Sequence, residues 1–306
     1  MIYDLIILGA GPAGLAASIY ASYHKLSHLV IGDIIGGTAT EAVKIKNWPG
    51  TEMISGVELM QKFQYHAEGL GGKIVQAKIA GLKKGEEYFE INTNSENYQA
   101  KAILVALGTR RRKMNIPGED KFLGKGVSYC ATCDSMFFKN KTVSVVGGGN
   151  SAAMAASLLA EHASKVFLIY RGAELRCEPA TVDQLKANSK ISIIYNTNVL
   201  EVNGDKKVES IILDNDYQDS KILKVDGIFV EIGAMPSSDL LNELGVKLNE
   251  QGYVAVDQWG KTNVSGVYAA GDIISNTPGF NQIITASADG ATAVNAVYKY
   301  LKERKK

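Results

Sequence analysis

Residues Tyr3 to His24 read YDLIILGAGPAGLAASIYASYH, and this stretch decides the fold of the chain. An apolar run leads directly into Gly9, Gly11 and Gly14, and a helical pattern follows the last glycine. This order places the bare backbone N–H groups of a helix N-terminus at a tight turn, where they can bind a pyrophosphate. The stretch therefore predicts an α/β fold with a dinucleotide site after its first strand.

The next apolar run, SHLVIG, is predicted to form the second strand and ends at Gly32. In dinucleotide folds an acidic residue about 20 residues past the glycines binds a ribose. Asp33 lies one position beyond the strand end, so it is a candidate for this role.

The same pattern recurs at KTVSVVGGGNSAAMAASLLAEHASKVFLIYR. Residues Thr142 to Val146 predict a strand, and a helix is predicted from Asn150 to about Glu161. The turn between them carries Gly147, Gly149 and Ala152 at its three small positions. Two such units make two nucleotide sites, and the simplest chemistry that needs both is electron transfer between two cofactors. The alternative is one working site and one degenerate repeat.

A third marker is the run TNVSGVYAAGDI, which ends with Gly271, Asp272 and Ile273. Flavoproteins with two dinucleotide domains carry this element, and its aspartate is placed to bind the ribityl and phosphate region of the flavin. The first unit is thus predicted to bind FAD and to be discontinuous, because it recruits this C-terminal piece.

The predicted fold class is therefore α/β, with two Rossmann-like dinucleotide-binding domains of the three-layer ββα type. We expect the FAD-binding domain to comprise residues 1–112 and 238–306, and a NAD(P)H-binding type of domain to comprise residues 113–237. The chain is expected to cross between them in GTRRRKM, Gly108 to Met114, and in EIGAMPSS, Glu231 to Ser238.

Two of the three cysteines, Cys130 and Cys133, lie in the motif YCATCD. This spacing suits half of a zinc site, a structural disulfide or a pair that cycles between dithiol and disulfide. A zinc site needs about four ligands, and the chain has no second close cysteine pair and only scattered histidines. In a reducing compartment the redox-active pair is favoured. The third cysteine, Cys177, is expected to fill its site as a small apolar side chain.

The bulk composition excludes other classes. The 306 residues suffice for two domains, and the net charge of +1 gives no general attraction to nucleic acid or to an anionic membrane. The basic runs TRRRK and KERKK are interpreted as solvated surface. No segment approaches the roughly 18 apolar residues that span a bilayer, and Asp4 argues against a signal peptide. A cytoplasmic protein with no metal site is the expectation.

Over essentially its whole length the chain resembles the low-molecular-weight thioredoxin reductases. The motifs that carry the resemblance are GAGPAG, NWPG, GEDKFLGKGVSYCATCD, VVGGGNSA and AAGD. The cysteine motif is the specific one, because it lies at the start of the second nucleotide domain in such enzymes. The resemblance implies FAD, a homodimer, and reduction of a disulfide in thioredoxin or a thioredoxin-like protein.

The resemblance also implies which residues contact each cofactor. For FAD they are Gly9, Gly11, Pro12, Ala13, Gly14, Gly36, Gly37, Thr38, Asn47, Gly108, Gly271, Asp272, Gln282 and Ile283. For NADPH they are Gly147, Gly149, Asn150, Ser151, Ala152, Arg171 and Arg176.

Three residues carry the catalytic roles that the resemblance implies. Cys133 faces the flavin, Cys130 attacks the disulfide of the partner, and Asp134 serves as the acid/base for the departing thiolate or flavin. The other interpretation of Asp134 is a helix cap or a surface carboxylate. The run DSMFF after the pair could begin a helix whose N-terminus lowers a thiol pKa.

The electron donor is where the sequence departs from the family pattern. NADPH selection needs cations for its 2′-phosphate, and the usual run is His-Arg-Arg followed three residues later by Arg. Here it reads YRGAELR, so Arg171 and Arg176 remain while Tyr170 and Gly172 replace the histidine and the middle arginine. NADPH stays the first prediction, followed by NADH or relaxed use, and then by a nucleotide-independent donor such as reduced ferredoxin or another flavin.

Two rival functions fit part of the pattern. The flavoprotein component of an alkyl hydroperoxide reductase shares these motifs, but it normally bears an N-terminal thioredoxin-like module, whereas this chain begins at its FAD strand. A flavin-binding redox sensor without turnover would use the cysteine pair only to report redox state. In the family, rotation of the second domain lets the flavin meet nicotinamide and disulfide in turn, and we expect the two crossing segments to form the hinge.

Overall fold

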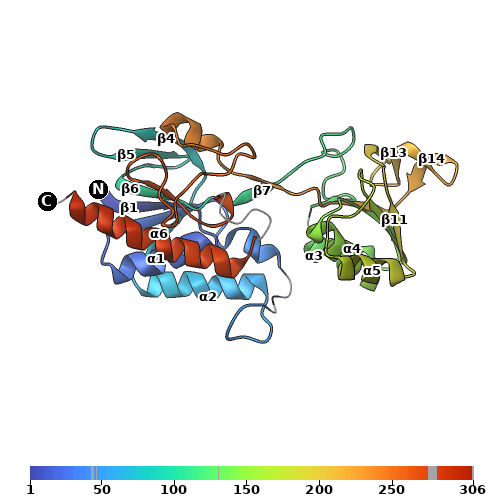
Figure 1. Ribbon diagram of the computed structural model, residues 1–306, viewed down its shortest axis with the longest axis horizontal. Helices are drawn as coiled ribbons and strands as arrows, with labels where there is room; N and C mark the ends of the chain where they lie inside the picture. Colours follow the sequence, from blue (N-terminus) through green and yellow to red (C-terminus); the bar gives the residue numbers. More distant parts are fainter. Residues whose placement is uncertain (43–44, 46, 130, 275–280, 305–306) are drawn as a thin grey trace. The chain divides into compact units, whose positions relative to one another are not determined.

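The computed structural model describes residues 1–42, 45, 47–129, 131–274 and 281–304. The chain divides into two compact units: unit 1 comprises Met1–Arg110 and Met235–Lys306, and unit 2 comprises Arg111–Ala234. Both changes of unit lie inside the crossing segments named from the sequence, a few residues before the expected boundaries at 112/113 and 237/238. Each unit has its own main sheet, as Figure 1 shows, and its own hydrophobic core.

Unit 1 is built on a seven-stranded sheet with the order β3-β2-β1-β6-β5-β4, in which β17 also pairs with β6. The strands β3, β2, β1, β6 and β17 run parallel, whereas β4 and β5 form an antiparallel extension. The strands are β1 (Ile2–Leu8), β2 (His28–Gly32), β3 (Lys73–Gln76), β4 (Ile79–Lys84), β5 (Phe89–Thr93), β6 (Asn97–Val105) and β17 (Val267–Ala269).

Helices cover one face of this sheet, and the last helix of the chain runs beside the first, as Figure 1 shows. They are α1 (Pro12–Tyr23), α2 (Gly56–Gly69) and α6 (Ile283–Glu303). The short 3-10 turns are η1 (Gly37–Glu41), η3 (Asp239–Leu244) and η4 (Gly271–Ile273), and η3 packs on the opposite face of the sheet. Because side chains alternate along a strand, β1 feeds two cores. Leu5 and Ile7 pack with α1 and α6, and Ile6 and Leu8 pack on the opposite face.

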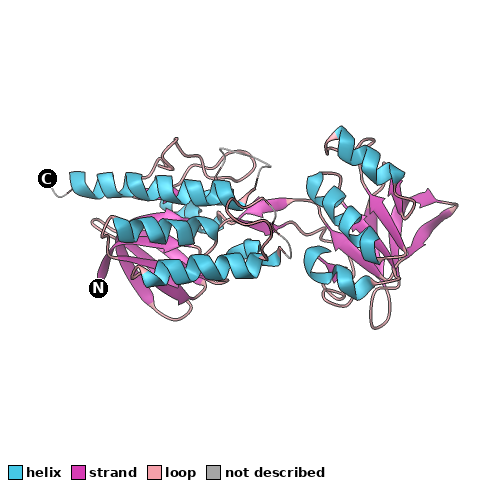
Figure 2. Cartoon of the chain, turned by 90° about the horizontal axis from the view of Figure 1, so that it is seen from below, coloured by secondary structure: helices cyan, strands magenta, loops and turns pink. Residues whose placement is uncertain are grey.

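Unit 2 repeats the plan with a five-stranded parallel sheet in the order β11-β10-β9-β15-β8 and a separate antiparallel sheet β12-β13-β14. Figure 2 distinguishes these strands from the helices of the unit. The strands are β8 (Val127–Ser128), β9 (Thr142–Val146), β10 (Lys165–Ile169), β11 (Ile191–Ile194), β12 (Val199–Asn203), β13 (Ser210–Tyr217), β14 (Ser220–Lys224) and β15 (Gly227–Val230). The helices are α3 (Ala131–Asp134), η2 (Ser135–Phe138), α4 (Asn150–His162) and α5 (Pro179–Ala187).

The two crossing segments pair with each other as the short strands β7 (Thr109–Arg111) and β16 (Ala234–Pro236). The basic run TRRRK lies here, and three of its cations are used in ion pairs. They are Arg110 with Asp239 at 2.7 Å, Arg111 with Glu231 at 3.2 Å and Lys113 with Asp120 at 2.8 Å. The run is therefore ordinary charged surface, as interpreted from the sequence.

The predicted α/β class with parallel sheets is confirmed, and both glycine turns join a strand to a helix as expected. Within the described residues, no helix is both long enough and apolar enough to cross a bilayer.

Candidate functional site

The first glycine turn lies at the carboxyl end of β1. Gly11 is the N-cap of α1 and carries no capping side chain, and Pro12 is the first helical residue. A Cβ added to Gly14 would lie 1.8 Å from the carbonyl oxygen of Gly9, so the first turn of α1 can pack against the glycine turn only without a side chain there. The N–H groups of the helix N-terminus are therefore left for a ligand.

A second glycine pair lies against this turn. The N–H of Gly36 donates to the carbonyl oxygen of Ala10 at 2.7 Å, and a Cβ added to Gly37 would be 3.1 Å from the Cα of Gly11. Thr38 follows in η1. The structure thus brings together two groups of predicted FAD residues that are separated in the sequence.

The C-terminal piece reaches the same turn from the other side. Gly271 follows β17, and a Cβ on it would lie 2.9 Å from the Cβ of Ala13. Farther along, Gly290 of α6 packs on the carbonyl oxygen of Ala13, at 2.1 Å from an added Cβ. The recruitment of the C-terminal segment that the sequence predicts is therefore an observed contact of unit 1.

Asp272 in η4 is an unusual carboxylate. Burial raises its pKa from 3.8 to about 6, the nearby Asp289 adds to this effect, and a hydrogen bond with Asn281 opposes it. Burial also raises the pKa of Asp289, against a hydrogen bond from the Gly271 backbone. A buried carboxylate is stabilised when a ligand hydroxyl donates to it, which matches the role predicted for Asp272.

The remaining predicted FAD residues lie around the N-terminus of α6 and the end of β6. The side-chain amide of Asn47 donates to the Gln282 side-chain oxygen at 2.9 Å. Ile283 packs against the cluster of Ile45, Ile54, Leu59 and Met60. The turn after β6 contains Gly108, which has a positive φ of 61°.

Asp33 is exposed just after β2, and its backbone oxygen accepts a hydrogen bond from the Gln76 side chain at 3.0 Å. The residues present therefore fit a dinucleotide: a helix N-terminus without a capping side chain, close-packed glycines and a buried carboxylate meet in one place.

The second glycine turn lies at the carboxyl end of β9. Gly149 is the N-cap of α4 and has no capping side chain, and a Cβ added to it would meet nothing within 4 Å. Asn150 and Ser151 begin the helix as exposed residues, whereas Ala152 is buried. Gly147 completes the turn with a φ of 148°.

The loop after β10 folds back onto this turn. The N–H of Arg176 donates to the carbonyl oxygen of Gly148 at 2.6 Å, and the Arg176 guanidinium lies 5.8 Å from the centre of the Tyr170 ring. Arg171 is exposed. The close packing of Gly148 with Tyr170 was not predicted from the sequence. The available signal was the run of three glycines, Gly147 to Gly149, together with an aromatic residue at the end of the next strand.

The cysteine motif lies between β8 and β9, at the start of the second sheet. Cys130 lies outside the described residues, and Cys133 belongs to α3, which begins within the motif and not after it. Asp134 is the N-cap of η2 but makes no capping side-chain hydrogen bond, so its helix-cap interpretation is not supported. Beyond it, Met136 and Phe137 are 64% and 80% exposed.

Cys177 is a free, partly buried cysteine that packs against the core under α4, as its small apolar character predicts.

A buried carboxylate was also missed. Glu119, 2% exposed, accepts hydrogen bonds from the backbone N–H groups of Met114 and Asn115 at 2.9 and 2.6 Å and from the hydroxyl of Tyr129. Burial, followed by the hydrogen bond to Glu119, raises the pKa of Tyr129 well above its usual value. Glu119 thus ties the segment entering unit 2 to the residue before Cys130.

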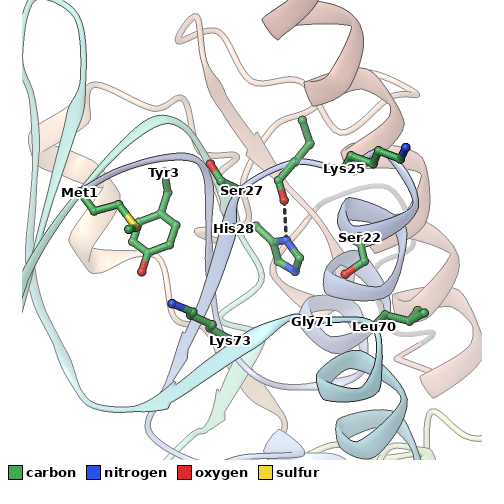
Figure 3. Close-up of a pocket in the computed structure, with 10 residues that line it drawn as sticks. Met1, Tyr3, Ser22, Lys25, Ser27, His28, Leu70, Gly71 and Lys73 are labelled. Atoms are coloured by element: carbon green, nitrogen blue, oxygen red, sulfur yellow. Dashed lines mark hydrogen bonds between the residues drawn. The ribbon is translucent and has the colours of Figure 1, made fainter.

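An open hollow of about 390 Å³ lies at the opposite edge of the unit 1 sheet from the glycine turns, and Figure 3 shows its lining. His28 is buried beside it, with its ring nitrogens hydrogen-bonded to the Leu26 carbonyl at 3.0 Å and the Ser18 hydroxyl at 2.9 Å. The hollow lies at the amino ends of β1 and β2, so within unit 1 it is separate from the first glycine turn at the carboxyl end of β1.

Comparison with known proteins gives consistent results. Residues 3–290 match the family described as pyridine nucleotide-disulphide oxidoreductase. Thioredoxin reductases of Listeria innocua and Bacillus subtilis are 37% and 38% identical, each over 99% of this chain and over 95% and 96% of the relative. The solved thioredoxin reductase of Lactococcus lactis superposes with a TM-score of 0.90 at 34% identity, covering 98% of this chain and 99% of that one. The chain belongs to the pyridine nucleotide-disulphide oxidoreductase family, among the low-molecular-weight thioredoxin reductases.

Proposed function

We propose that this protein reduces the disulfide of a thioredoxin or thioredoxin-like protein with electrons that pass through FAD and the pair Cys130 and Cys133. The observation that carries this proposal is the position of the motif: it opens the second nucleotide unit, and the strongly exposed Phe137 follows it on a short helix. An exposed aromatic side chain beside a redox pair suits a protein acceptor, because aromatic residues dominate protein-binding surfaces.

FAD fits unit 1, where the first glycine turn, the Gly36–Gly37 pair and Asp272 meet. The N-terminus of α1 would hold the pyrophosphate, and Asp272 would accept a hydrogen bond from a ribityl hydroxyl. When bound and reduced by the donor, the flavin would supply the two electrons that return the cysteine pair from disulfide to dithiol.

The cysteines perform the exchange itself. The Cys130 thiolate attacks one sulfur of the acceptor disulfide, which forms a mixed disulfide and expels the other acceptor sulfur as a thiolate. The Cys133 thiolate then attacks the sulfur of Cys130, so that the acceptor leaves as a dithiol and the pair returns to the disulfide. Asp134 would give the proton that the departing thiolate takes up.

The donor is proposed to be a reduced pyridine nucleotide bound at the second glycine turn. Arg171 and Arg176 favour NADPH, the first prediction from the sequence, whereas the packing of Tyr170 favours NADH and is considered in the next section. A nucleotide-independent donor, reduced ferredoxin or flavin, is the remaining alternative. A homodimer and a cytoplasmic location stay proposals that rest on the family and the sequence.

Replacing Cys133 with serine tests the function. The Cys133→Ser variant should bind FAD and undergo flavin reduction, but it should lose thioredoxin reduction, because Cys130 alone cannot resolve the mixed disulfide. The measurement is anaerobic flavin bleaching followed by addition of oxidised thioredoxin, with Cys177→Ser as the matched control that keeps activity. Thioredoxin turnover by Cys133→Ser would sink the assignment.

A further inference from the structure

The two glycine repeats differ at one equivalent position, at the carboxyl end of the second parallel strand of each: the residue after the one that pairs with the end of the first strand. In unit 1 the last residue of β1 pairs with Ile31, and Gly32 comes next; in unit 2 the last residue of β9 pairs with Ile169, and Tyr170 comes next. In dinucleotide folds this position lies beside the adenosine ribose. The two repeats therefore offer different surroundings to a ribose.

Each residue touches the middle residue of its own glycine turn. A Cβ added to Gly32 would lie 2.7 Å from both the N and the Cβ of Ala10, so unit 1 has no side chain at this position. In unit 2 a Cβ added to Gly148 would lie 2.3 and 2.4 Å from Cδ2 and Cε2 of Tyr170. The Tyr170 ring therefore packs directly on the Gly148 backbone, whereas in unit 1 the Ala10 methyl group lies against Gly32 and leaves no room for a side chain there.

The other edge of the ring packs on Gly172. A Cβ added there would lie 2.6 Å from Cε1 and 2.9 Å from Cζ of Tyr170. Position 172 is where the family pattern has its middle arginine, and an arginine cannot enter while the phenol keeps this place. Tyr170 and Gly172 are thus one coupled change.

Of the two remaining cations, Arg176 is drawn into the loop, whereas Arg171 is exposed. The backbone N–H of Arg176 donates to Gly148, and its guanidinium lies over the Tyr170 ring at 5.8 Å from the ring centre, a cation–π arrangement. The turn at Gly149, in contrast, stays open at the N-terminus of α4. The pyrophosphate position is kept, while the position for a 2′-phosphate is altered.

We propose that Tyr170, together with Gly172, sets the nucleotide choice of unit 2, so that it takes NADH, which lacks the 2′-phosphate, at least as well as NADPH. A 2′-phosphate is recognised by the guanidinium groups of arginines. Here the Tyr170 ring excludes an arginine from position 172, and the guanidinium of Arg176 lies over the ring. The inference rests on the proposed function, because it names the donor for that site.

The test is anaerobic reduction of the FAD-loaded protein by NADH and by NADPH, with flavin bleaching followed over a range of nucleotide concentrations. The quantity to compare is the rate constant of bleaching divided by the apparent Kd of the nucleotide. In the native protein we expect this ratio to be less than about threefold higher for NADPH than for NADH. The double variant Tyr170→His with Gly172→Arg should shift this ratio toward NADPH by about tenfold or more, the effect of one restored charge-assisted contact. Tyr170→Phe keeps the ring and should leave the ratio unchanged.

A larger preference of the native protein for NADPH would overturn the inference, and so would a failure of both nucleotides to bleach the flavin. It would also be overturned if Tyr170→Phe changed the ratio between the nucleotides as much as the double variant does. The native ratio decides the matter even if the double variant does not fold. Photochemically reduced native protein separates the two proposals: it should still reduce oxidised thioredoxin whatever the nucleotide result, and failure there would count against the proposed function.

Discussion

Asp272 is a side chain whose burial opposes the stability of the cofactor-free protein. Its pKa in the fold is about 6, above the value of 3.8 expected in the unfolded chain. A raised folded pKa contributes stability that is fully present below 3.8 and is lost as the pH rises through about 6. The ionised form is also the one that accepts a ligand hydroxyl without competition from its own proton.

Asp272→Asn should therefore have opposite effects on stability and on binding. At about pH 8 the FAD-free variant should be more stable than the native protein, by an amount on the order of 3 kcal/mol at most, and the difference should vanish near pH 4. Its affinity for FAD should fall by roughly tenfold or more, because an amide is the weaker acceptor. Thermal melting across the pH range and flavin fluorescence titration measure the two effects. Equal melting temperatures at every pH would contradict the burial argument.

At this scale the sequence predicts what depends on a short local pattern. Gly9, Gly11 and Gly14 adjoin one another in a motif with a known geometry, so their place at a helix N-terminus could be expected. The contact of Tyr170 with Gly148 could not, because residues 22 positions apart meet only when two strands lie in register. The hydrogen bond that the Tyr129 hydroxyl donates to Glu119 was also missed, because it depends on how the chain between the two residues folds.

At the scale of elements, the contact between α1 and α6 makes the first nucleotide site. Gly290 lets α6 approach the carbonyl oxygen of Ala13, where an added Cβ would be 2.1 Å away. Because Ala13 belongs to the first turn of α1, a displacement of α6 would also move the backbone beside the glycine turn.

Gly290→Ala should thus lower the stability of unit 1 by about 1–3 kcal/mol, the usual cost of overpacking, and weaken FAD binding as well. Gly69→Ala is the matched control, since it places the same methyl group in α2 where nothing lies within 4 Å. The control should be neutral or slightly stabilising. Melting temperatures and FAD titrations of both variants test this. Similar effects in the two variants would show that helix propensity, and not the close approach of α6 to Ala13, determines the change in stability.

Long periodic elements were foreseen and short ones were not. The strand from Thr142 to Val146 and the helix from Asn150 emerge as β9 and α4 because each buries a regular apolar face. The start of α3 inside the cysteine motif carries no such periodicity, so the helix was expected only after it. Four residues are too few for a pattern to show.

At the scale of the whole molecule, two connecting segments join the units, and glycines with positive φ flank their paired strands. Gly233 has a φ of 99°, and a Cβ on it would meet nothing within 4 Å. If the units reorient during turnover, as the family resemblance implies, backbone freedom at such residues is what permits it.

Gly233→Ala should restrict that freedom: the added methyl group meets no neighbouring atom, but a φ of 99° is strained for an L side chain. We expect thioredoxin turnover to fall by roughly threefold or more while the rate of flavin reduction by dithionite stays the same. Gly124→Ala is the control, because Gly124 has a φ of 71° and open surroundings but lies away from the connecting segments. Stopped-flow and steady-state rates compare the two, and equal losses of turnover would argue against a hinge.

The large-scale organisation could be expected from three glycine-containing motifs and their order along the chain. The exact residues at which the chain changes unit could not, because β7 and β16 are three residues each and pair only with one another.

The discontinuity of unit 1 also fixes the order in which the protein can form during synthesis. All of unit 2 is made before β17 and α6, the elements that complete the first sheet and its helical cover. Until then β6, which already pairs with β1, lacks its second parallel neighbour β17, and Ala13 lacks its partner helix. Unit 2 can thus fold during translation before unit 1 is complete. The first nucleotide site, which includes Gly271 and Asp272, forms only when translation is almost finished.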